Sequence, residues 1–106
     1  MGEAPTISTH ILDTELGQPA PGINVALYRV EGDAEAVVGR GTTDDDGRIG
    51  NLLNGTLVSG TYRLAFELDG AFFRQASVTF VVDDSSRSYH VPLLLAPYSL
   101  STYRGS

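Results

Sequence analysis

The chain has 106 residues, 42% of them hydrophobic, and a formal net charge of -6. This size allows one domain with a modest core, which we expect to span residues 1–106. The acidic charge argues against a nucleic-acid or anionic-membrane partner, because such partners require clustered basic residues and the seven cations are scattered arginines. Cysteine is absent, so disulfides and thiolate metal sites are excluded, and the redox compartment cannot be read from the sequence.

The N-terminal segment MGEAPTIST has neither the basic start nor the apolar run of a secretory signal. No stretch of the chain approaches the ~18 apolar residues that a membrane-spanning helix needs. We therefore expect a soluble, cytoplasmic protein that does not bind membranes.

Short runs of alternating or β-branched residues recur roughly every ten residues, separated by clusters of Gly, Asp, Asn and Ser. This pattern is typical of an antiparallel sandwich or barrel, and the turn residues between the runs agree with it. No amphipathic helix of useful length is predicted. The eight predicted strands, in chain order, are residues 6–13, 23–30, 36–42, 48–53, 61–68, 77–82, 88–95 and 98–104.

Both histidines of the chain lie in predicted strands, where successive side chains point to opposite faces. In the first strand His10 shares a face with Ser8, and in the seventh His90 lies opposite an apolar face. Pro92 cannot donate to a strand ladder, so it predicts an edge or a bulge beside His90. Two mixed polar faces that each carry a histidine are what a site built across a sheet requires.

The C-terminal segment, residues 90–106, continues from an apolar strand into the tetrapeptide YRGS. Chain ends usually fray unless other parts of the protein hold them in place. An ending of this composition therefore indicates that the terminus occupies a functional position.

Three segments, ISTHILDTELGQPAPGINVALYRV, GTTDDDGRIGNLL and SYHVPLLLAPYSLSTYRGS, closely resemble the transthyretin-like family in its enzymatic branch, the 5-hydroxyisourate hydrolases. YRGS is the most discriminating motif, because hormone-carrying transthyretins lack it. The resemblance implies an all-β, eight-stranded, two-sheet sandwich that forms a homotetramer, a dimer of dimers with active sites in the channel between them. The family's usual short helix is expected to be missing or reduced to a turn, because only ELDGAFFRQAS separates YRLAF from VTF.

The resemblance also implies the site residues, and it places the first, fourth, seventh and eighth strands in one sheet. His10 matches the histidine of the STH motif, Arg48 the arginine of DGR, and His90 the histidine before VPLLL. The catalytic residues implied are His10, Arg48, His90 and Ser106, and the substrate-binding residues implied are His10, Arg48, Tyr103 and Arg104.

The activity implied by the resemblance is hydrolysis of 5-hydroxyisourate to 2-oxo-4-hydroxy-4-carboxy-5-ureidoimidazoline in urate degradation, with no cofactor or metal. A neutral imidazole suits this reaction as a base for water attack on the cyclic amide, because the usual histidine pKa is about 6.5. Arg48 would hold the substrate oxygens, while Tyr103 and Ser106 would donate hydroxyl hydrogen bonds and the terminal carboxylate could orient an imidazole. The identity of the general base stays open, with His10 preferred.

Structural explanations compete with each assignment. A lone histidine on a half-polar strand face is more often structural than catalytic, and Arg48 after DDDG could be an exposed turn residue. The acidic run at 44–46 lacks the ligand spacing of a calcium loop, and no cluster has zinc spacing. The rival functions are a non-catalytic transthyretin-like carrier of small ligands and a structural β-sandwich module. The YRGS motif and the two motif histidines favour the enzyme.

Overall fold

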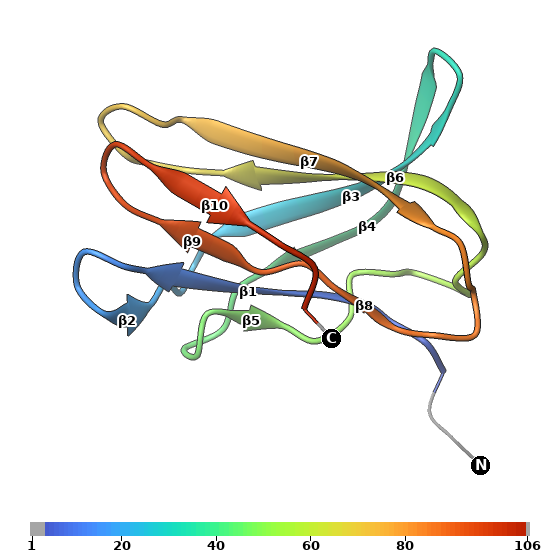
Figure 1. The fold of residues 1–106 in the computed structure, drawn as a ribbon, viewed down its shortest axis with the longest axis horizontal. Helices are drawn as coiled ribbons and strands as arrows, with labels where there is room; N and C mark the ends of the chain where they lie inside the picture. Colours follow the sequence, from blue (N-terminus) through green and yellow to red (C-terminus); the bar gives the residue numbers. More distant parts are fainter. Residues whose placement is uncertain (1–3, 106) are drawn as a thin grey trace.

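The computed structural model describes residues 4–105, which fold into two β-sheets (Figure 1). The described residues contain strands and no helix, which confirms the predicted all-β class and the loss of the short helix. The strands are β1 (Ile7–Asp13), β2 (Gln18–Pro19), β3 (Asn24–Glu31), β4 (Ala34–Thr42), β5 (Arg48–Ile49), β6 (Gly60–Glu67), β7 (Gln75–Val82), β8 (Tyr89–His90), β9 (Leu93–Leu95) and β10 (Leu100–Thr102).

One sheet is organised around β1, which pairs with β2, β5, β8 and β9, while β10 pairs with β9. Strands β8 and β9 run parallel to β1, and β2 and β5 run antiparallel to it. The second sheet has the order β4-β3-β6-β7 and is antiparallel throughout. The first sheet therefore joins the four segments predicted to share a sheet, and β1 lies at its centre.

The core is formed by alternate side chains from both sheets. Ile7, Thr9 and Ile11 of β1 are buried, as are Leu27 and Leu64 of the facing sheet. Apolar burial of this kind is the main driving force for packing the two sheets face to face. The other face of β1, which carries His10, is left outside this core.

The predicted seventh strand, 88–95, is divided into β8 and β9 at Val91–Pro92. Pro92 has no N–H to donate, so the ladder is interrupted as its position predicted. Two threonine hydroxyls satisfy the carbonyl groups at the break: Thr9 Oγ1 donates to Val91 O at 2.6 Å, and Thr102 Oγ1 donates to Pro92 O at 2.7 Å. The chain therefore stays tightly held beside His90 without a regular ladder.

Two other predicted strands are shorter than expected. The one at 48–53 is reduced to β5, because the Asn51 side chain accepts the Leu53 N–H at 3.1 Å and forms a local turn. The one at 98–104 is reduced to β10, and a turn in which Ala96 N donates to Ser99 O precedes it. Strand β2 was not predicted; its segment, expected to be only a turn, pairs with the end of β1.

The connection between β6 and β7 covers residues 68–74 and is closed by a hydrogen bond from Leu68 N to Arg74 O, 3.0 Å long. It carries no helix, as the short sequence between the two strands predicted. Within residues 4–105, no helix is long and apolar enough to span a membrane.

Candidate active site

Strand β1 supplies the middle of the site. Because its buried residues alternate with outward ones, Ser8 and His10 share the face that points away from the core. Arg48 of β5 lies opposite His10 on one side of β1, and His90 of β8 lies opposite Ser8 on the other. Directly opposed residues of paired strands point to the same face. The sheet thus places Arg48, His10 and His90 on one surface, as the sequence predicted.

Arg48 is positioned by the tight turn that precedes it. Asp44 Oδ1 accepts hydrogen bonds from Asp46 N at 2.9 Å and Arg48 N at 3.0 Å. Gly47 adopts φ 75°, a conformation that a glycine takes without strain, and its carbonyl accepts Ile11 N at 2.7 Å. The acidic run is therefore a turn that fixes the start of β5 against β1, and the Arg48 side chain is left exposed.

His90 is held by hydrogen bonds along both its backbone and its ring. The residues on either side of it donate backbone hydrogen bonds to the segment of β1: Tyr89 N to Thr6 O, 2.8 Å, and Val91 N to Ser8 O, 2.9 Å. Its ring atom Nδ1 lies 2.8 Å from Ser8 Oγ. The His90 residue is half-buried.

The pKa of His90 is lowered from its usual value. Partial burial is the largest cause, because it disfavours the charged ring, and electrostatic repulsion from His10 and from Arg48 adds to it. Hydrogen bonding to the Ser8 backbone opposes the shift. His90 is consequently neutral at physiological pH, which is the form that accepts a proton.

The C-terminal residues reach the site through an antiparallel bridge between His90 and Gly105, in which Gly105 N donates to His90 O at 2.8 Å. Tyr103 is 55% exposed. Arg104 packs its guanidinium carbon 4.7 Å from the centroid of the Tyr89 ring, and Tyr89 is buried beneath the sheet. Because adjacent side chains of a strand point to opposite faces, this contact places the exposed Arg104 side chain on the face of β8 opposite the His90 ring. Ser106 and its carboxylate lie outside the described residues.

The sequence predicted candidate site residues but gave no role to the residues that hold them in place. It placed Ser8 on the face of His10 without pairing it to His90, and it assigned no contact to Thr9 or Tyr89. The available signal was their position: Ser8 and Thr9 immediately precede His10 in the STH motif, and Tyr89 precedes His90. Their contacts depend on the parallel register of β1 and β8, which no local pattern reveals.

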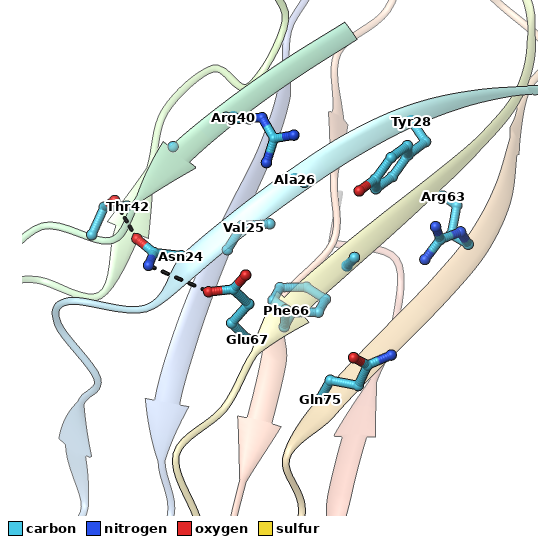
Figure 2. A pocket seen from close by; sticks show the side chains of 12 residues that line it. Asn24, Val25, Ala26, Tyr28, Arg40, Thr42, Arg63, Phe66, Glu67 and Gln75 are labelled. Carbon is cyan, nitrogen blue, oxygen red and sulfur yellow. Dashed lines mark hydrogen bonds between the residues drawn. The ribbon is translucent and has the colours of Figure 1, made fainter. Parts of the chain in front are cut away.

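Two hollows of the described surface lie away from the histidines. Figure 2 shows one of about 480 Å³ on the β4-β3-β6-β7 sheet, where Asn24 accepts a hydrogen bond from Thr42 and donates one to Glu67. Another, of about 220 Å³, lies between β7 and β10. Neither is lined by the two histidines or Arg48, whereas Tyr103 and Arg104 line the second. Among the described residues, no group of three His, Cys, Asp or Glu side chains is placed to hold a metal.

Comparison with protein families identifies the architecture. The model of the HIUase/Transthyretin family matches residues 7–105, a span that includes both histidines and Arg48. The chain belongs to this family. That membership confirms the resemblance seen in the sequence, and it agrees with the two-sheet arrangement around β1.

Members of the two branches of the family differ in how similar they are to this chain. The chain is 43% identical to 5-hydroxyisourate hydrolase 2 of Rhizobium meliloti (strain 1021), over the whole of both chains. The structure of Klebsiella pneumoniae 5-hydroxyisourate hydrolase superposes with a TM-score of 0.82 and 38% identity, covering 95% of this chain and 99% of that one. Sea bream transthyretin in complex with thyroxine superposes with a TM-score of 0.84 but 27% identity, covering 93% of each. The backbone alone does not separate the branches, whereas sequence identity is higher to the hydrolases.

Proposed function

We propose that this chain is an enzyme that hydrolyses 5-hydroxyisourate to 2-oxo-4-hydroxy-4-carboxy-5-ureidoimidazoline in urate degradation. The observation that carries the proposal is the meeting of Arg48, His10 and His90 on one face of the β1 sheet. This chain aligns over its whole length with a protein named as a hydrolase, and it carries these three groups in the family's motifs. The carrier alternative is not favoured, because the full-length relatives described above are named as hydrolases.

The reaction needs a base and a group that binds oxygen. It involves no redox step. A neutral imidazole removes a proton from water while the oxygen attacks a carbonyl of the cyclic ureide. Arg48 stabilises the negative charge that develops on the carbonyl oxygen, since its guanidinium is always charged and its donors form a rigid fork. His90 is suited to the neutral role by its lowered pKa. The preference for His10 as the base stays a prediction.

The terminal residues complete this proposal. Tyr103 is exposed, and we expect its hydroxyl to contact substrate, together with Ser106. The substrate contact predicted for Arg104 stays a prediction; in the position seen here its side chain packs on Tyr89.

We further propose that four copies assemble as a dimer of dimers, with the sites facing a shared channel. Strands β7 and β10 are at the edges of their sheets, and an edge strand offers unpaired backbone groups to another copy. Apolar side chains are exposed nearby, with Phe72 62% and Tyr98 77% accessible and their ring centroids 5.7 Å apart. A neighbouring subunit would also close the open sheet surface on which the histidines lie. The cytoplasmic location stays a prediction.

The enzyme assay uses freshly generated 5-hydroxyisourate and follows the loss of its ultraviolet absorbance. Decay much faster than the spontaneous rate is expected, and a rate equal to the spontaneous one would refute the proposal. His10→Ala and His90→Ala should each lower kcat/KM by at least ~100-fold if both rings take part in proton transfer. Sedimentation that found an active monomer would refute the channel arrangement.

A further inference from the structure

The imidazole of His90 is flanked on both edges by neighbouring segments of the sheet. On one edge its Nδ1 lies 2.8 Å from Ser8 Oγ of β1. On the other edge runs the C-terminal segment, where Gly105 bridges to the His90 backbone through a 2.8 Å hydrogen bond. Two segments that are 97 residues apart in sequence therefore enclose one ring.

Gly105 contacts the ring edge so closely that no side chain fits there. A Cβ added to Gly105 would lie 2.5 Å from His90 Cδ2 and 3.2 Å from Cγ. Carbon atoms in good contact are about 3.5–4.0 Å apart, so the ring would have to move by roughly 1 Å. Gly105 is not among the glycines with positive φ, so the requirement for glycine is one of space rather than of backbone conformation.

Ser8 determines which ring nitrogen is available. Because Nδ1 is engaged by Ser8 and the Cδ2 edge lies against Gly105, the free end of the ring consists of Cε1 and Nε2. A hydroxyl oxygen accepts from Nδ1–H whether the ring is neutral or charged, so this contact survives proton transfer at Nε2.

We propose that Ser8 and Gly105 are positioning residues that clamp the His90 imidazole, with Nδ1–H donating to Ser8 and the Nε2 lone pair facing the substrate. The proposal rests on the proposed hydrolase function for its kinetic consequences only. This arrangement assigns the base to His90 instead of the His10 preferred from the sequence: Nε2 takes a proton from the attacking water as the carbon–oxygen bond forms. The same proton passes to the ring nitrogen of the substrate as its amide bond breaks, which returns His90 to its neutral form.

The tautomer of His90 in the wild-type protein tests the clamp without any substrate. Long-range 15N–1H NMR correlation spectra of the histidine rings, assigned with His90→Gln, distinguish protonation at Nδ1 from protonation at Nε2. We expect Nδ1–H in the neutral ring. A proton on Nε2 instead would overturn the proposal.

The role of Ser8 is tested by removing and restoring its hydroxyl. Ser8→Ala is expected to shift His90 toward the Nε2–H tautomer and to lower kcat about 10-fold with KM nearly unchanged. A 10-fold loss is what the removal of one hydrogen bond typically causes. Ser8→Thr keeps the hydroxyl and should recover both the tautomer and most of kcat. Ser77→Ala, an exposed serine of β7, is the matched control and should change neither. An unchanged tautomer and kcat in Ser8→Ala, or a threonine variant as impaired as the alanine variant, would refute the role.

The role of Gly105 is tested by adding one methyl group. Gly105→Ala should lower kcat by about 100-fold, the usual cost of a 1 Å displacement of a reacting group, and should shift the His90 ring resonances. Gly55→Ala is the control, because a Cβ there meets no atom within 4 Å. Wild-type kcat and resonances in Gly105→Ala would overturn the steric argument. If wild-type protein failed to hydrolyse 5-hydroxyisourate, the proposed function would fall, while the ring resonances would still decide the clamp.

Discussion

Replacing Thr9 with valine removes the hydroxyl that holds β8 to β1 where Pro92 interrupts the ladder. Thr9 is 1% exposed, and its Oγ1 donates to Val91 O at 2.6 Å. Valine has nearly the same shape, so the change leaves the buried carbonyl of Val91 without this partner. Leaving such a group unsatisfied costs about 1–3 kcal/mol, and the buried methyl group returns about 0.8 kcal/mol.

The net loss of about 0.2–2.2 kcal/mol should lower the Tm by roughly 1–17 °C for a domain of this size, at about 4–8 °C per kcal/mol. Thermal unfolding followed by far-ultraviolet circular dichroism measures it, at equal protein concentrations because assembly also affects the Tm. Thr79→Val, an exposed threonine of β7, is the control for the change of side-chain chemistry. A shift in Thr9→Val no larger than in the control would refute the view that the Thr9 hydroxyl replaces the missing ladder.

Three other outcomes are expected. Deleting residues 103–106 should lower kcat/KM by at least ~100-fold and reduce stability far less; a fully active truncated protein would contradict the role given to the terminus. Arg48→Ala should raise the pKa of His90 in an NMR titration, because one of the positive charges that lowers it is gone, and an unchanged pKa would show that the two groups are not coupled. Since the lowered pKa means that the unfolded chain binds more protons, the free energy of unfolding should fall as pH drops below about 6.5. Urea unfolding at several pH values should find this dependence weaker in His90→Gln, and equal dependence in both proteins would count against it.

The sequence alone was sufficient for the fold class, and it supplied the candidate site residues that the sheet then brings together. Alternation of apolar and polar residues identified the long strands, since a half-buried strand must repeat every second residue. The motifs around His10, Arg48 and His90 led to the family and to a shared sheet. Short strands were less predictable. Strands β5 and β10 are shortened by turns, one formed by the Asn51 side chain and the other by the Ala96–Ser99 hydrogen bond. Strand β2 is defined only by its pairing with β1.

Only the tertiary structure decided how the site is held. The parallel register of β1 and β8 puts Ser8 rather than His10 directly opposite His90, and the bridge to Gly105 brings the chain end to the same ring. The structure also shows that the Arg104 guanidinium packs on the Tyr89 ring and that the Thr9 hydroxyl makes a structural hydrogen bond. Local composition determines which face of a strand is apolar, because that depends on adjacent residues. Register between distant strands depends on the packing of the whole sandwich, so no segment of the sequence contains it.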